Sequence, residues 1–159
     1  MKANALIFGL TLAAGALGIG AGGTASAATA QNINANGNSC KNYNAWDVQD
    51  IDYYVHGVRN INVDARYVIC PLASHPVSGP GQSFIVDGSN YNGYSTTCTI
   101  YAYDFNGNFL SSTSFTRSDA IYSNATQVSS VSYWGYTSML CLLPGSTGGI
   151  LRGVTTIDS

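Results

Sequence analysis

The stretch Thr96-Thr-Cys-Thr-Ile-Tyr-Ala-Tyr-Asp-Phe-Asn-Gly-Asn-Phe-Leu-Ser-Ser-Thr-Ser-Phe-Thr116 predicts a β-hairpin. Apolar or aromatic residues alternate with hydroxyl-bearing residues on both sides of Asn106-Gly107, which is the pattern of paired, half-buried strands. Asn-Gly suits a two-residue turn because both positions need a positive φ, which glycine adopts freely and asparagine better than most residues. The sequence therefore places the turn of the hairpin at Asn106-Gly107.

This turn fixes which residues of the two strands face each other. One face then pairs Cys98 with Phe115, Ile100 with Thr113, Ala102 with Ser111 and Asp104 with Phe109. The other face carries Tyr101, Tyr103 and Leu110. The register thus divides the hairpin into a face with a cysteine and a face with two tyrosines.

The rest of the chain has an all-β composition. Helix formers are scarce after Ala30, whereas Tyr, Thr, Ser, Val, Asn and Gly are abundant. Seven or eight short strands separated by Gly, Pro and Asn predict a two-sheet antiparallel sandwich with jelly-roll or Greek-key connections, and a closed β-barrel is the alternative. Besides the hairpin, the expected strands are residues 51–58, 65–72, 83–87, 128–131, 138–143 and 150–157.

The N-terminus predicts export. A lysine, an apolar run from Ala5 to Ala21 and the small-x-small site Ala25-Ser-Ala27 indicate a secretory signal peptide at residues 1–27. No cysteine at the cleavage site offers a lipid anchor, and we expect no stable membrane anchor after cleavage. Residues 28–41 then form a polar arm and residues 42–159 a single β-sandwich domain, placed in the periplasm or secreted.

Charge is sparse in this mature part. This part contains five basic residues, Lys41 and four arginines, and eight aspartates. The chain has no glutamate, so the formal charge is 5 − 8 = −3. Nucleic-acid binding depends on clustered lysine and arginine, and so does attachment to anionic lipid. The sequence therefore argues against both partners.

Four cysteines in an exported chain predict two disulfides, and three pairings are possible. We favour Cys40 with Cys70, which would fasten the arm, and Cys98 with Cys141, which would tie the hairpin to a late strand. Such crosslinks would hold two layers of extended chain together. Zinc is disfavoured because no two cysteines are close in sequence.

Three motifs in this order are similar to those of a group of small exported bacterial proteins of uncharacterised function. They are the Cys-Pro strand Val68-Ile-Cys-Pro-Leu72, Cys98-Thr99 followed by Asp104-Phe-Asn-Gly-Asn108, and Met139-Leu-Cys-Leu-Leu-Pro144. The resemblance implies a disulfide-linked β-sandwich in the bacterial envelope or outside the cell. It implies no activity and no catalytic residues.

No residues form a convincing catalytic or metal-binding set, and we expect no cofactor. His75 with nearby aspartates could serve a small secreted hydrolase, whereas His56 lies in an expected strand and has a structural role. Asp47, Asp50 and Asp52 fit a solvated segment or a loose calcium site. Asp104-Phe-Asn-Gly-Asn108 resembles the start of a calcium loop, but its glycine is misplaced and no glutamate follows, so a hairpin turn is the better interpretation.

Aromatic residues are the one feature that points to a function. Exposed rings on a rigid sandwich bind sugars and protein surfaces, since a flat ring offers apolar area at small entropic cost. The alternative is that these tyrosines belong to the core. We expect a non-catalytic binding or structural module that contacts a glycan or an envelope protein, or else a subunit of a surface assembly. The candidate contact residues are Tyr91, Tyr94, Tyr101, Tyr103, Tyr133, Trp134 and Tyr136.

Overall fold

The computed structural model describes residues 32–73 and 81–157, and these form two antiparallel β-sheets. The predicted signal peptide at residues 1–27 and His75 lie outside the described residues. The six-stranded sheet contains β1 (Ile33–Asn36), β3 (Ile51–Tyr54), β4 (Gly57–Asn60), β6 (Gln82–Asn90), β9 (Tyr122–Val128) and β11 (Gly149–Ile157). The five-stranded sheet contains β2 (Lys41–Asn42), β5 (Arg66–Leu72), β7 (Thr96–Tyr103), β8 (Phe109–Arg117) and β10 (Tyr136–Leu143).

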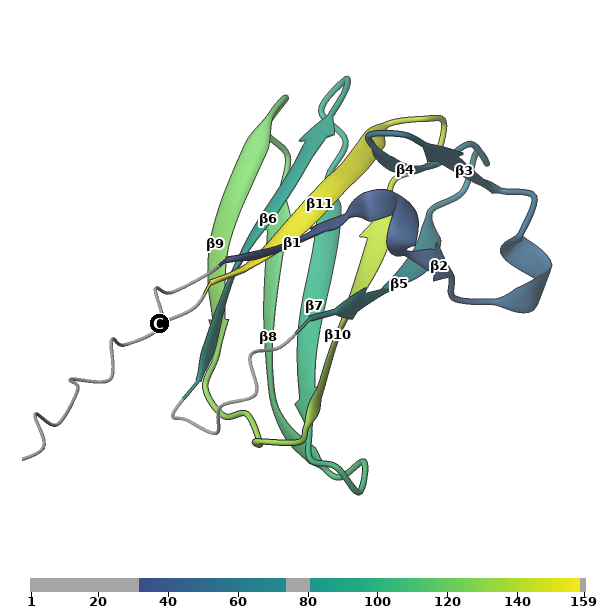
Figure 1. Cartoon of the computed structure of the whole chain (residues 1–159). Helices are drawn as coiled ribbons and strands as arrows, with labels where there is room; N and C mark the ends of the chain where they lie inside the picture. The colour runs from purple at the N-terminus through teal and green to yellow at the C-terminus, as the bar shows by residue number, and fades with distance from the viewer. Residues whose placement is uncertain (1–31, 74–80, 158–159) are drawn as a thin grey trace, which may run out of the picture.

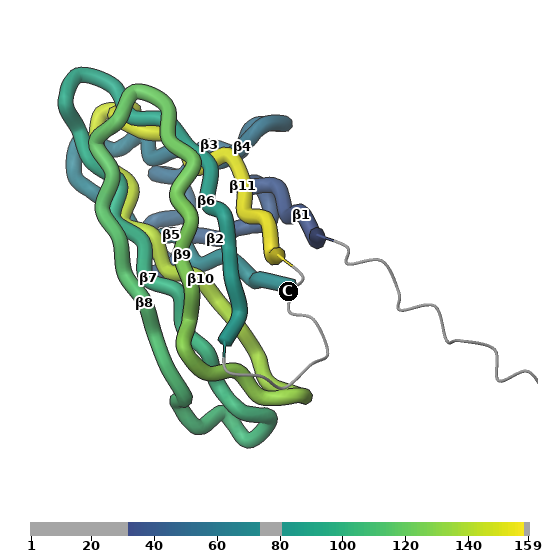
Figure 2. Tube along the Cα trace, turned by 90° about the vertical axis from the view of Figure 1, so that its left-hand side faces the viewer, coloured from purple at the N-terminus to yellow at the C-terminus, as the bar shows by residue number. Residues whose placement is uncertain are grey.

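The two sheets pack face to face and do not close into a barrel, which confirms the predicted sandwich (Figures 1 and 2). The strand orders are β3-β4-β11-β6-β9, with β1 also paired to β11, and β2-β5-β10-β7-β8. The late strands β10 and β11 are thus inserted between early strands, so most pairings join residues far apart in sequence. Among the described residues, no helix is long and apolar enough to cross a membrane.

The core lies between the sheets and follows the period-two pattern of the strands. In β7, every second residue from Thr96 to Ala102 is buried, and the residues between them are half-buried on the outer face. The largest fully buried apolar side chains come from both layers, and they are Val58, Val68, Phe84, Val86, Ile100, Val128, Met139, Leu143 and Leu151. This alternation gives each sheet an inner face in the core and an outer face toward solvent.

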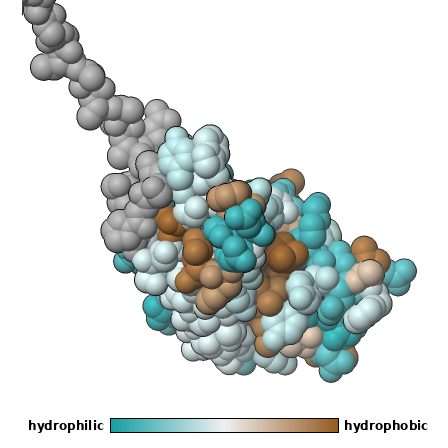
Figure 3. Space-filling view, turned by 90° about the horizontal axis from the view of Figure 1, so that it is seen from below, coloured by the Kyte–Doolittle hydropathy of each residue, from teal (hydrophilic) through white to brown (hydrophobic). Residues whose placement is uncertain are grey.

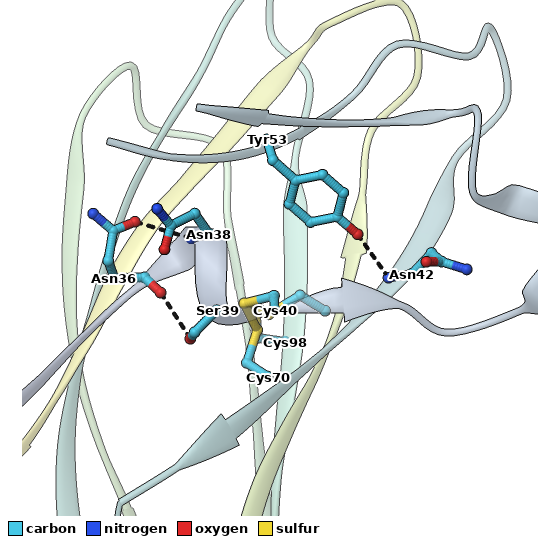
Figure 4. Close-up of a disulfide and its surroundings, with 9 residues drawn as sticks. Asn36, Asn38, Ser39, Cys40, Asn42, Tyr53, Cys70 and Cys98 are labelled. Atoms are coloured by element: carbon cyan, nitrogen blue, oxygen red, sulfur yellow. Dashed lines mark hydrogen bonds between the residues drawn. A yellow bond between two sulfur atoms is a disulfide. The ribbon is translucent and has the colours of Figure 1, made fainter. Parts of the chain in front are cut away.

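The structure joins Cys40 to Cys70 and Cys98 to Cys141, the pairing favoured from the sequence. Cys98 and Cys141 are direct partners across β7 and β10. Cys40 immediately precedes β2 and is bonded to Cys70 in the neighbouring strand β5 (Figure 4). Both disulfides therefore lie within the five-stranded sheet, and the expectation that they hold the two layers together is wrong.

The segment expected to be a polar arm contributes to both sheets. Residues Ile33–Asn36 pair with β11 along their whole length, although asparagine is uncommon in strands. The short 3₁₀ helix η1 (Gly37–Ser39) then carries the chain across the edge of the sandwich to Cys40. Backbone pairing and the Cys40–Cys70 disulfide thus fix a segment that has little apolar side chain to bury.

The hairpin has the predicted strands but a different turn. Cys98 opposes Phe115, Ile100 opposes Thr113 and Ala102 opposes Ser111, as predicted. A bulge then makes Tyr103, not Asp104, the partner of Phe109, and Leu110 packs against the core. Only Gly107 in this turn has a positive φ, of 83°, because Asp104 organises a longer loop with its side chain.

Three strand predictions are wrong in their extent. Residues 51–58 form a hairpin of β3 and β4 that turns at Val55-His56, so His56 is an exposed turn residue. The strand expected at residues 128–131 instead ends at Val128 and begins at Tyr122, so that β9 occupies residues 122–128 at the edge of the six-stranded sheet. Strand β6 continues through Gly88, where a Cβ atom would collide with the ring of Tyr122 on the neighbouring strand.

Candidate ligand-binding surface

A groove of about 340 Å³ lies on the outer face of the five-stranded sheet. It runs over the central strand β10, between β5 on one side and β7 on the other. We call it the tyrosine groove, and it is lined by Tyr43, Ile69, Tyr101, Tyr103, Ser138 and Leu140.

The strand registers place these side chains together. Ile69 opposes Leu140 across β5 and β10, and Tyr101 opposes Ser138 across β7 and β10. Directly opposed residues project to the same face of a sheet, so these side chains form one surface. The buried Cys98–Cys141 disulfide joins the same two strands on the inner face, which holds β7 and β10 in fixed register beneath the groove.

The tyrosine rings at the groove are held by neighbouring rings. Tyr101 and Tyr103 are stacked, with ring centroids 6.3 Å apart and an interplanar angle of 25°. Tyr43 follows β2 and donates its backbone N–H to Tyr67 O (3.0 Å), and the two rings meet edge to face at 6.3 Å. The groove is therefore bounded by rings whose positions are set before any ligand binds.

More aromatic residues surround the end of the groove near Tyr103. Tyr136 opposes Tyr103 and is 63% exposed, and the Phe109 ring meets the Tyr103 ring edge to face at 6.1 Å. Tyr133 and Trp134 lie in the loop before β10 with their rings in contact at 4.7 Å. From below, the molecule shows separate brown apolar patches among pale and teal residues (Figure 3).

Two predicted contact residues lie elsewhere. Tyr91 and Tyr94 are in the connection that leads into β7, whereas Tyr103 is the last residue of that strand. Tyr91 donates its backbone N–H to Gly148 O (2.8 Å), and the ring of Tyr94 lies close to the Gly148 Cα. These tyrosines therefore belong to the opposite end of the sandwich from Tyr103.

The tyrosine groove offers stacking and hydrogen bonding with little charge. Ser138 supplies a hydroxyl group, and the tyrosines supply more. Lys41, in the edge strand β2, is the one charged side chain among the outward-facing residues of the described strands of this sheet, and it lies over the ring of Tyr53 (5.7 Å). Such a surface suits a neutral ligand that presents flat apolar faces and hydroxyl groups.

The groups considered for catalysis or metal binding have other partners. Arg66 contacts Asp50 (2.7 Å) and Asp47 (3.3 Å), and this pairing lowers the pKa of Asp50. Arg59 pairs with Asp52 at 3.2 Å. Within the described ranges, no three His, Cys, Asp or Glu side chains gather as metal ligands.

Asp104 is occupied by the hairpin turn. Its Oδ1 accepts hydrogen bonds from the backbone N–H groups of Asn106 and Asn108 at 2.8 Å, and its Oδ2 accepts one from Asn108 Nδ2 at 2.8 Å. These bonds, with the Asn108 side chain first, hold the pKa of Asp104 below its usual value. The carboxylate therefore serves as a turn cap.

Sequence reasoning missed four of the six lining residues of the groove, namely Tyr43, Ile69, Ser138 and Leu140. The period of two groups Tyr67, Ile69 and Pro71 on one face of their strand, but the period alone does not say which face is buried. The cysteines carried that signal, since paired cysteines are buried and the residues on either side of Cys70 and Cys141 must then face outward.

Known structures share the fold. The C-terminal CBM6 of LamC, a marine laminarinase from Zobellia galactanivorans, aligns with a TM-score of 0.53 and 13% identity over 80% of this chain and 100% of that chain. A family 35 carbohydrate-binding module from Clostridium thermocellum aligns with a TM-score of 0.52 and 14% identity over 81% of this chain and 99% of that chain. No protein-family model and no curated protein matches the sequence. The chain is therefore a β-sandwich similar in fold to these two modules.

Proposed function

We propose that this protein is a non-catalytic binding module that holds a neutral glycan on the outer face of its five-stranded sheet. The observation that carries this proposal is the tyrosine groove, where stacked rings border a hydroxyl-bearing floor. The apolar faces of sugar rings stack on aromatic side chains, while their hydroxyl groups need hydrogen-bonding partners. The groove offers groups for both kinds of contact.

Three further observations support the proposal. The fold is the one found in the two carbohydrate-binding modules, although the low identity carries no ligand assignment. The two disulfides suit an oxidising compartment, in keeping with the proposed secreted or periplasmic location. The resemblance to small exported bacterial proteins, which remains a prediction, suggests the same compartment.

Titration of soluble polysaccharides against the purified protein tests the proposal. The panel is laminarin, xylan, galactomannan and dextran, measured by isothermal titration calorimetry. Tyr101 lines the groove and stacks on Tyr103, so Tyr101→Ala should weaken binding by about tenfold, whereas Tyr101→Phe keeps the ring and should bind within a few-fold of wild type.

Tyr91→Ala is the matched control, because Tyr91 is 45% exposed but lies outside the groove. This variant should bind as the wild type does. Absence of binding to every polysaccharide in the panel would refute the glycan proposal. Loss of binding in Tyr91→Ala but not in Tyr101→Ala would instead move the site to the opposite end of the sandwich.

A further inference from the structure

Trp46 is the most exposed aromatic residue among those described, with 81% of its surface accessible. It lies in the 3₁₀ helix η2 (Ala45–Asp47), within the loop that joins β2 to β3. Tryptophan is usually well buried, since burying its large apolar surface stabilises the fold. A ring left this exposed does little for folding and is available to a ligand.

The loop that displays Trp46 is held rigid by polar contacts. Asp47, the next residue, is only 4% exposed, and its Oδ2 accepts a hydrogen bond from Asn44 Nδ2 at 2.9 Å. Arg66 bridges Asp47 and Asp50, and Asn42 Nδ2 donates to Asn44 O at 2.6 Å. A ligand that stacks on Trp46 therefore meets a loop whose backbone is already ordered, which lowers the entropic cost of binding.

The loop that carries Trp46 begins at the tyrosine groove. Tyr43 forms one end of the groove, and Trp46 follows it by three residues. The loop projects beyond β2 at the edge of the five-stranded sheet (Figure 1). A polymer that leaves the groove past Tyr43 is thus directed toward the loop that carries Trp46.

The charges of the loop indicate which polymer fits. Asp47 and Asp50 share one arginine, so this cluster has a residual negative charge. An anionic polymer would be repelled here, whereas a neutral one would not. Beside Trp46, the exposed apolar residue Val48 adds only a small surface, which suits a single sugar face better than a broad protein interface.

We infer that Trp46 provides an additional stacking site for the same neutral glycan, beyond the Tyr43 end of the tyrosine groove. The inference rests on the proposed function of that groove. Long chains occupy both the groove and Trp46, while short oligosaccharides occupy the groove alone. Affinity consequently rises with chain length, and Trp46 is the residue responsible for the later part of that rise.

The test uses cello-, laminari-, xylo- and manno-oligosaccharides of two to six sugar units. Trp46→Ala should bind the shortest ligands as the wild type does and should lose about tenfold in affinity for the longest. Val55→Ala, a substitution of an exposed apolar residue in the turn between β3 and β4, should bind all lengths like the wild type. Because Trp46 is so exposed, its replacement should leave the fold intact.

Fluorescence gives a second readout. The chain has two tryptophans, so Trp46 is the only one in the Trp134→Phe variant. Its emission should change when a six-unit ligand binds and stay constant when a two-unit ligand binds.

The outcomes separate this inference from the proposed function. If no oligosaccharide binds the wild type, the glycan proposal itself fails. If Tyr101→Ala weakens binding at every length but Trp46→Ala matches the wild type at six units, the groove is the site and the role of Trp46 is refuted. If Trp46→Ala loses the same affinity for oligosaccharides of every length, Trp46 does not lie beyond the groove. If the fluorescence of Trp46 changes only when a protein partner is added, the glycan is not its ligand.

Discussion

The two outer faces of the sandwich carry grooves of similar size but different chemistry. The tyrosine groove on the five-stranded sheet has a volume of about 340 Å³ and contains three tyrosines. The groove on the six-stranded sheet has about 420 Å³, and its polar side chains are Asn34, Asn36, Asp87 and Thr155, with no aromatic ring. Cavity size therefore does not distinguish the two faces, whereas the stacked tyrosine rings do.

The two sheets also differ in how their strands are held together. Both disulfides lie in the five-stranded sheet, one joining β7 to β10 and the other joining Cys40, beside β2, to β5. Among the described residues, the strands of the six-stranded sheet are joined by hydrogen bonds and the Arg59–Asp52 ion pair but by no disulfide, and β11 has a bulge between Leu151 and Gly153. The face that carries the tyrosines is thus the covalently braced one, and this bracing fixes the spacing of the rings.

Removal of the Cys98–Cys141 disulfide should give the largest effect. The bond closes a loop of 43 residues, so the double variant Cys98→Ala with Cys141→Ala should lose about 4 kcal/mol of unfolding free energy. Denaturant titration measures this loss. Hydrogen exchange should accelerate most at amides of β7 and β10, because these strands lose their direct link.

Removal of the Cys40–Cys70 disulfide is the matched control. Its loop of 30 residues is only slightly shorter, so the loss of stability should be similar, but local opening should concentrate at β1, η1 and β2. An equal increase of exchange across both sheets in both variants would show that the disulfides do not brace the tyrosine face selectively.

A smaller effect is expected at Tyr122, on the inner face of the six-stranded sheet. Burial raises the pKa of Tyr122 to about 12, and the nearby Asp87 adds to the shift. The Thr96 hydroxyl partly offsets this rise in pKa, but its hydrogen bond goes to Asn90 Oδ1 (2.7 Å), and among the described residues Tyr122 Oη has no hydrogen-bond partner. In the unfolded chain the pKa is about 10, so the stability that depends on protonated Tyr122 is complete below that pH and is lost as the pH rises toward 12.

Tyr122→Phe removes this dependence. Between pH 8 and pH 11, wild type should lose about 1.4 kcal/mol more stability than the variant. At pH 11 Tyr122 is ionised in the unfolded chain but still protonated in the folded one, and pH 11 lies about one unit above the unfolded pKa. Urea titrations of both proteins at the two pH values measure this difference. The ionisation of the other tyrosines affects both proteins equally and does not contribute to it. Parallel loss in the two proteins would mean that Tyr122 is solvated in the folded state.

The fold could be predicted from sequence because its signals are local. Alternation over Thr96–Tyr103 is readable within a short window and indicated the hairpin strands, and the even number of cysteines indicated two disulfides. Strand β9 lacked such a signal, because its core-facing residues are Tyr122, Asn124, Thr126 and Val128, of which two are polar. Backbone pairing to β6, which no local pattern reveals, determines that strand.

Only two of the six lining residues of the groove could be predicted, because the site depends on which strands become neighbours. Tyr101 and Tyr103 could be placed on one face of the hairpin, but the groove also needs β10 beside β7 and β5 beside β10. Those pairings join residues about 40 to 70 positions apart, as for Tyr101 with Ser138 and Ile69 with Leu140. Loop aromatics such as Tyr91 looked equivalent in sequence, and only the topology separates them from the groove.

The smallest predicted effect concerns Asp104, whose hairpin turn adjoins the Tyr103 end of the tyrosine groove. Its hydrogen bonds require the carboxylate, and they hold its pKa below the ordinary value near 3.9. Because the pKa of Asp104 is lower in the folded protein than in the unfolded chain, this stabilisation is complete above the pKa of the unfolded chain. It is lost as the pH falls through the pKa of the folded protein. Asp104→Ala should therefore slightly lower the melting temperature at pH 7, and the difference from wild type should disappear in strong acid. Asn108→Ala, which removes one of the three bonds, should give a smaller decrease at pH 7, and a decrease as large as that of Asp104→Ala would assign the turn's stability to the Asn108 side chain.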